Sequence, residues 1–219
     1  MARSKETLVS ILGSSYCQPI ANLVERWKAF TPHRPNKVQS GFYEHDYASS
    51  VILLLVAMFE SYVVRLRFVQ DSKVPPNART ALDVVFALFP RLRHRKALID
   101  VYVARDSIFH NHLWEIEYSW RGLPGMVLDA ATKHPAFGDK KYDARVNPKT
   151  RRTRALGVNV VPTRVDRRDV LKVFDTIWKT LLVFEAQNRF QCYVSHENVR
   201  FSGKTVPFPD VIGQLRRAL

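Results

Sequence analysis

The sequence has few cysteines, and it has no long hydrophobic run. Cys17 and Cys192 are its only cysteines among 219 residues, too few for a disulfide framework or a cysteine-based zinc site. A reducing compartment follows from this, and we predict a cytoplasmic protein. The opening residues Met1 to Glu6 begin no apolar stretch of the signal-peptide kind. The longest apolar run, Val51 to Phe59, is too short to span a bilayer, so we expect no membrane partner.

Several catalytic motifs are missing as well. No pair of histidines at four-residue spacing accompanies a glutamate, and no Cys-His cluster occurs, so metal-dependent hydrolysis has no support. No serine lies in a Gly-x-Ser-x-Gly turn. Gly203-Lys204-Thr205 is similar to the end of a phosphate-binding loop, but Asn198 stands where that loop needs a glycine. We therefore expect no metal and no cofactor.

Acidic residues are outnumbered by basic ones. The chain has 34 Lys and Arg against 20 Asp and Glu, which gives a formal net charge of +14. Between Lys133 and Arg168, 11 basic residues stand against 3 aspartates. A balance so far from neutral favours a polyanionic partner, with nucleic acid ahead of an anionic membrane. The alternative is a basic soluble protein without such a partner.

The remaining composition is that of a globular protein, 46% hydrophobic and 25% charged. We predict one mainly helical domain over residues 1–219, with its core at about 44–190. A helical segment within residues 5–30, interrupted near Gly13 and Pro19, precedes that core. Apolar residues at helical spacing predict further helices over residues 44–70, 77–89, 91–120, 166–189 and 210–219. Residues 191–209 alternate well enough for a short β-hairpin.

Residues 121–165 break the helical pattern, because glycines and prolines recur through them. We interpret this segment as an irregular basic insertion in which residues 156–161 form a short strand. It would guide RNA, with Phe137 and Tyr142 stacking on bases. The alternative is a solvated loop without a function. The predicted nucleic-acid-binding residues are Lys140, Lys141, Arg145, Lys149, Arg151, Arg152 and Arg154.

The most informative segment runs from Ala104 to His112 and contains Arg105, His110 and His112. An arginine presents a fork of donors that matches phosphate oxygens, and a histidine exchanges a proton near neutral pH. At 100° per residue, Arg105 and His112 fall in the middle of an apolar stripe, where a charged side chain must reach solvent, pair with a carboxylate or face a cleft. The stripe consists of Leu98, Tyr102, Phe109, Ile116 and Trp120.

Two further charged features surround this segment. Glu60 lies at the edge of the apolar stripe of the helix over residues 44–70, and we predict that it pairs with Arg105; the alternative is a solvated glutamate. The basic cluster at residues 91–96 opens the predicted helix and opposes its dipole, so an anion compensates it; the alternative is a solvated charge run or a turn that precedes the helix. On an ideal helix His110 lies about 140° from Arg105, so geometry favours His112.

Arg105-Asp106-Ser107-Ile108-Phe109-His110-Asn111 resembles the Arg, polar residue, three variable residues, His, Asn signature of HEPN domains. The segment Ala57 to Tyr62 is similar to the acidic helix that precedes this signature in several branches. The resemblance covers about residues 44–190, and only the short signature is specific. A toxin branch has a modified tyrosine two residues after the histidine, where this chain has His112.

The resemblance implies an all-helical homodimer whose composite cleft cleaves RNA without metal, by attack of the 2′-hydroxyl on the adjacent phosphate. Arg105 would stabilise the phosphorane, His110 would be the general acid or base, with His112 as second choice, and Asp106 and Asn111 would orient them. One alternative is a non-catalytic HEPN-like module that binds nucleic acid or another protein. Another is a helical interaction protein without nucleic-acid partners. A cognate inhibitor protein and a toxin or defence role follow from analogy only.

Overall fold

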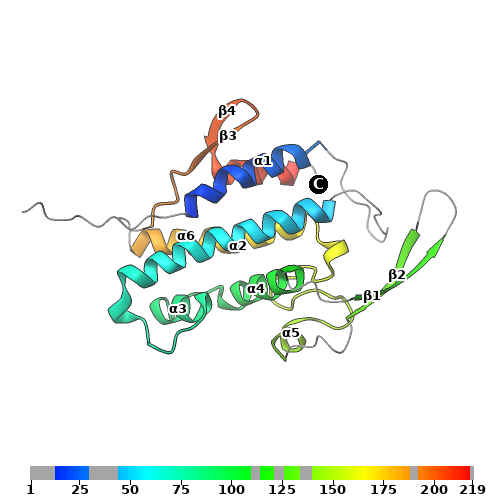
Figure 1. The fold of residues 1–219 in the computed structure, drawn as a ribbon, viewed down its shortest axis with the longest axis horizontal. Helices are drawn as coiled ribbons and strands as arrows, with labels where there is room; N and C mark the ends of the chain where they lie inside the picture. The colour runs from blue at the N-terminus through cyan, green and yellow to red at the C-terminus, as the bar shows by residue number, and fades with distance from the viewer. Residues whose placement is uncertain are drawn as a thin grey trace, which may run out of the picture.

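The structure, a computed structural model, describes residues 13–29, 44–109, 114–120, 126–133, 140–187 and 192–217. It is mainly helical with short β-hairpins, which confirms the predicted fold class (Figure 1). The helices are α1 (Cys17–Trp27), α2 (Glu44–Val69), α3 (Ala81–Leu88), α4 (Arg95–Phe109), α5 (Lys140–Arg145), α6 (Arg167–Gln187) and α7 (Phe208–Arg217). The strands are β1 (Trp114–Trp120), β2 (Met126–Lys133), β3 (Asn198–Phe201) and β4 (Lys204–Pro207).

Helix α2 is the centre of the bundle. It contacts α1 on one side, α3 and α4 on the other, and α6 behind (Figure 1). Ile52, Leu55, Met58 and Phe59 are fully buried in these contacts. By length and composition alone α2 would also suffice to cross a membrane, a test that the core helix of a soluble protein passes as well; half of its apolar window is buried within the fold.

One hydrophobic core joins the helices, and it is larger than predicted. It runs beyond the expected range of 44–190, because α1 contributes Ile20 and Trp27 and α7 contributes Ile212 and Leu215. Within it the rings of Phe89 and Phe184 stack at 4.7 Å between centroids. Pro19 does not interrupt α1, since it lies in the first turn, where a missing amide hydrogen costs no helical bond.

A buried ion pair fixes the beginnings of α2 and α6 to each other. Arg167 and Glu44 are 1% and 3% exposed, and two guanidinium nitrogens donate to the two carboxylate oxygens at 2.8 and 2.7 Å. The indole of Trp27 donates to Glu44 at 2.8 Å, which brings α1 into the same junction. A buried charge is tolerated only when it is paired and hydrogen-bonded in this way.

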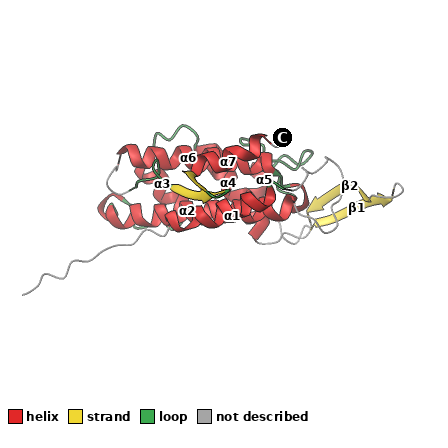
Figure 2. Cartoon of the chain, turned by 90° about the horizontal axis from the view of Figure 1, so that it is seen from above, coloured by secondary structure: helices red, strands yellow, loops and turns green. Residues whose placement is uncertain are grey.

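The predicted helix over residues 91–120 is too long. Helix α4 ends at Phe109, and residues 114–120 form β1, which pairs antiparallel with β2 and has a bulge between Glu117 and Tyr118. Ile116 and Trp120 therefore belong to a strand, which corrects the helical stripe assigned to them. In Figure 2 this hairpin extends from one end of the helical bundle.

The described part of the basic insertion has more secondary structure than predicted. It includes β2, α5 and a loop at residues 146–166 that packs on α4. Residues 156–161 form no strand; Arg152 and Asn159 make an isolated β-bridge instead. Asp100 of α4, fully buried, accepts hydrogen bonds from the backbone amides of Ala155 at 2.7 Å and Leu156 at 2.9 Å, and from the guanidinium of Arg145.

The C-terminal part follows the prediction closely. Strands β3 and β4 form the expected hairpin, joined by Ser202 and Gly203, which both have positive φ (49° and 76°) as a tight two-residue turn requires. Helix α6 matches the predicted range within two residues at each end and begins with Asp166 accepting from the amide of Arg168 at 2.9 Å. Helix α7 follows β4 directly.

Candidate functional site

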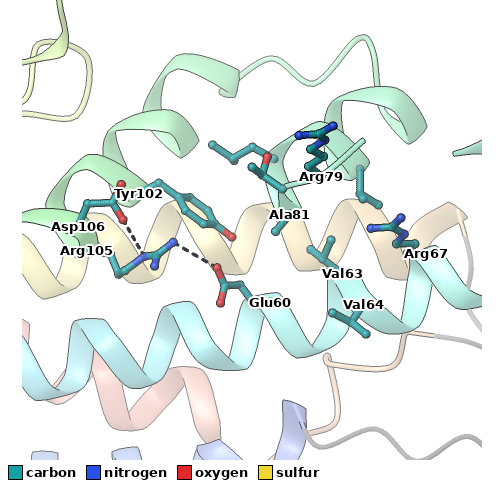
Figure 3. A pocket seen from close by; sticks show the side chains of 12 residues that line it. Glu60, Val63, Val64, Arg67, Arg79, Ala81, Tyr102, Arg105 and Asp106 are labelled. Carbon is teal, nitrogen blue, oxygen red and sulfur yellow. Dashed lines mark hydrogen bonds and ion pairs between the residues drawn. The ribbon is translucent and has the colours of Figure 1, made fainter. Parts of the chain in front are cut away.

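Arg105 lines a pocket between α2, α3 and α4, with a volume of about 450 Å³ (Figure 3). Its side chain is 26% exposed. The predicted apolar environment is present, because Tyr102 one turn earlier and Val63 across the pocket are buried. The pocket is lined by Glu60, Val63, Val64, Arg67, Arg79, Thr80, Ala81, Leu82, Val84, Tyr102, Arg105 and Asp106.

Two carboxylates hold the guanidinium of Arg105. Its Nη2 donates to Glu60 Oε1 at 3.4 Å, which is the ion pair predicted from the sequence, and its Nε lies 3.1 Å from Asp106 Oδ1. The centroid of the Tyr102 ring lies 5.1 Å from the guanidinium carbon. Ion pairs at this exposure stabilise a fold by less than about 1 kcal/mol, so their main effect is to orient the guanidinium.

Tyr102 places a neutral hydroxyl beside this pair. The residue is 4% exposed, and burial raises the pKa of its phenol well above the usual range; the Glu60 charge raises it further, while Arg105 opposes both. The phenol therefore stays protonated at any physiological pH. In Figure 3 the ring lies between Arg105 and the rest of the pocket, with its hydroxyl on the Glu60 side.

The histidines predicted to transfer protons cannot be placed relative to this pocket. His110, Asn111 and His112 lie outside the described residues, and the described helix ends with Phe109, which is 65% exposed. The structure thus places Arg105, Asp106 and Glu60 in one site and leaves the proposed proton-transfer groups as predictions.

Sequence reasoning missed Arg67 and Arg79, which line the same pocket. Arg67 follows Glu60 by seven residues, so two helical turns place both on one face of α2. That spacing was a usable signal. Arg79 had no such signal, because it reaches the pocket only through the turn that brings α3 back against α2.

The predicted nucleic-acid-binding residues divide into two groups. Lys149 and Arg154 are exposed, and Arg151 is half-buried with φ +54°. Arg145 pairs with Asp100, and the Arg152 guanidinium donates to the carbonyl of Gly157 at 2.9 Å, so these two connect the loop to the fold. The side chains of Lys140 and Lys141 lie outside the described residues, as does Phe137.

Tyr142 requires a correction. It was expected to offer a ring for stacking on bases, but it is 6% exposed and belongs to a small cluster with Val103, Val146 and Val160. The cluster fastens α5 to α4, so the ring is unavailable to a ligand. The sequence does not indicate whether an aromatic ring in a basic segment faces solvent or the protein interior.

The basic cluster before α4 is partly engaged in the fold. The guanidinium of Arg95 lies over the Phe86 ring at 4.0 Å, and His94 Nε2 lies 2.7 Å from Thr180 Oγ1. Arg91 and Arg93 are exposed, and the first turn of α4 has no acidic residue. With Lys96, which is also exposed, the cluster includes three cations that remain open to solvent near the start of α4.

No family model, curated protein or solved structure matches this chain. Within the described ranges no group of three His, Cys, Asp or Glu side chains could hold a metal ion. What the site offers is a recessed pocket with three arginines, two carboxylates and an apolar wall.

Proposed function

We propose that this protein is a metal-independent endoribonuclease of the HEPN type. The observation that carries the proposal is the placement of Arg105: an oriented guanidinium faces a pocket and precedes His110 by five residues in the sequence. A fixed cation in a recessed site stabilises a charged phosphorane better than a mobile one, because no reorganisation is needed as charge develops. Glu60 and Asp106 supply that fixation.

The reaction balances without a cofactor. A general base takes the proton of the 2′-hydroxyl, whose oxygen bonds to the adjacent phosphorus, and the bond from phosphorus to the 5′-oxygen breaks. A general acid returns a proton to that oxygen, leaving a 2′,3′-cyclic phosphate and a 5′-hydroxyl. We assign the proton transfers to His110, with His112 as second choice, and the phosphorane contact to Arg105. Asn111 and Asp106 orient these groups.

A homodimer with a composite cleft is part of the proposal. Outside the pocket lining, α2 exposes Phe68 (64%) and α4 exposes Phe109 (65%). Large apolar side chains exposed near a pocket are common at interaction surfaces. A second copy docked there would cover these side chains and bring the two segments at residues 105–112 toward each other.

The test is cleavage of a labelled single-stranded RNA in the presence of EDTA. We expect wild-type protein to produce 2′,3′-cyclic phosphate ends, and Arg105→Ala and His110→Ala each to reduce kcat by about a hundredfold or more. Arg26→Ala and His196→Ala are matched controls, because both residues are exposed and lie outside the pocket. Cleavage that persists in both site variants at the wild-type rate contradicts the proposal.

The second candidate is a non-catalytic module of the same fold, and one observation favours it. The Arg105 guanidinium already has two carboxylate neighbours, so an RNA phosphate must compete with Glu60 and Asp106 for it. RNA binding that survives Arg105→Ala, without any cleavage by wild-type protein, supports the module over the enzyme.

A further inference from the structure

The pocket extends well beyond Arg105, and its far end is also cationic. In Figure 3, Arg105, Asp106 and Glu60 lie at one end, and Arg67 and Arg79 lie at the other, with Val63, Val64 and Ala81 between them. Glu60 and Arg67 are separated by about 10 Å along the axis of α2, at 1.5 Å per residue. Two cationic centres thus share one recessed pocket.

The two ends differ in how their arginines are compensated. Arg105 has Glu60 and Asp106 as neighbours. Among the described residues, neither the Arg67 nor the Arg79 side chain has a hydrogen bond or ion pair, and both are exposed at the pocket rim. The far end of the pocket therefore carries more uncompensated positive charge than the end at Arg105, and it is the better place for an anion to bind.

The N-terminus of α3 adds backbone amide donors at the end of the pocket where Arg67 and Arg79 lie. Thr80 is the N-cap: its hydroxyl accepts from the Asp83 amide at 3.2 Å, and the Asp83 carboxylate accepts from the amides of Thr80 and Arg79. The next two amides, of Ala81 and Leu82, have no partner within the helix, and both residues line the pocket. Asp83 is the acidic group of this end, and its hydrogen bonds to Thr80 hold its pKa below the usual range.

The wall between the two ends is apolar. Val63 and Val84 are buried beneath it, and Val64, Ala81 and Leu82 complete it. Such a surface suits the flat face of a base or the carbon side of a ribose, because it desolvates them without offering a hydrogen bond that would select one base.

From these contacts we infer that Arg67 and Arg79, with the first amides of α3, bind a phosphate that flanks the scissile one, while the apolar wall takes the nucleoside between them. The inference rests on the proposed function and narrows its substrate to single-stranded RNA. A base in a duplex is stacked and paired and cannot enter a recess of about 450 Å³, whereas a single strand can turn one nucleoside into it.

The experiment uses the double variant Arg67→Gln/Arg79→Gln of the full chain. Its matched control is Arg26→Gln/Arg216→Gln, which loses the same charge on α1 and α7, away from the pocket lining. Binding is measured with a labelled single-stranded 2′-O-methyl RNA, which has no attacking hydroxyl and is not cleaved. Cleavage of the matching unmodified RNA gives kcat and KM separately.

We expect the pocket variant to raise Kd and KM about tenfold each through lost phosphate contacts, with a shallower salt dependence, and the control to change both less than twofold. A single-stranded RNA with uncharged methylphosphonate linkages should bind the wild-type protein and the pocket variant equally. An unchanged Kd in the pocket variant overturns the inference, as does equal loss in the control or equally tight binding of a duplex. If wild-type protein binds through Arg67 and Arg79 but cleaves nothing, the subsite stands and the nuclease proposal fails.

Discussion

At the scale of single residues, the buried charged side chains of this fold each connect two structural elements. Glu44 and Arg167 connect α2 to α6, Asp100 connects α4 to the loop at residues 146–166, and Asp169 connects that loop to α6. Their charges are compensated by hydrogen bonds from amides or guanidinium groups. These side chains therefore maintain the fold around the pocket without taking part in its chemistry.

Removing one member of the Glu44 and Arg167 pair should be costly. Glu44→Ala leaves the guanidinium buried without its carboxylate, and we expect the free energy of unfolding to fall by about 3 to 5 kcal/mol. Chemical denaturation measures this. Asp175→Ala is the control, because Asp175 pairs with Arg216 at the surface, where a pair contributes less than about 1 kcal/mol. An equal loss of unfolding free energy in Glu44→Ala and Asp175→Ala would contradict the larger contribution assigned to the buried pair.

Asp169 should make stability depend on pH. Burial, aided by the charge of Asp166, raises the pKa of this carboxyl to about 6, against hydrogen bonds from Asn159 and the charge of Arg152, which lower it. The folded state then binds the proton more tightly than the unfolded state, whose pKa is near 3.8. The stabilisation from this group is complete below pH 4 and is lost as pH rises to 6, about 3 kcal/mol in all.

The measurement compares unfolding free energies of wild type and Asp169→Asn between pH 4 and 7. Asparagine does not titrate, so the other groups cancel in the difference. We expect the wild-type advantage to shrink across this window and to level off above pH 6. A difference that is flat with pH, or that grows as pH rises, rejects the raised pKa.

At the scale of elements, the long helices were predictable and the end of α4 was not. Apolar residues recur every three or four positions through α2 and α6, so their limits could be predicted within two residues. In β1 the aromatic and aliphatic residues alternate with Glu115, Glu117 and Ser119, a strand pattern. Ile116 and Trp120 happen to satisfy both periods when counted from Leu98, and so the helix was extended in error.

The residues of the candidate site also divide into those that the sequence could place and those that it could not. Glu60 and Arg105 could be paired from sequence, because each is a charged residue at the apolar face of a long helix. Arg79 could not be placed, because its position depends on how the chain turns between α2 and α3, and such turns leave no periodic signal. Tyr142 is buried because it packs against Val103 of α4, and the sequence around Tyr142 does not indicate a contact with a different element.

The attachment of the basic loop to α4 should depend on Asp100. We expect Asp100→Asn to weaken the hydrogen bonds from the Ala155 and Leu156 amides and to release Arg145, because the charge that made them strong is gone. Amide hydrogen exchange over residues 146–160 should accelerate about tenfold or more, with α2 unchanged. Asp143→Asn, an exposed acid on α5, is the control; equal exchange in both variants would contradict the anchor.

At the scale of the whole molecule, the exposed apolar side chains near the pocket predict self-association. We expect wild-type protein to sediment as a dimer at micromolar concentration and Phe68→Glu to sediment as a monomer, because a charge would be buried in the contact. Any RNA cleavage should fall with the dimer. Leu182→Glu, at a 38% exposed residue of α6, should leave the dimer intact. A wild-type monomer, or a charged variant that still dimerises, argues against the composite cleft.

The position of α2 also has a consequence for biosynthesis. Its apolar face is completed by α6, and residues 70–166 must be translated between the two. At about 5 to 20 residues per second, roughly 5 to 20 seconds pass before α6 follows α2 from the ribosome. Throughout that interval the long apolar helix α2 has emerged without its principal neighbour. The nascent chain is therefore most prone to aggregation, and most dependent on chaperones, when it is about three-quarters made.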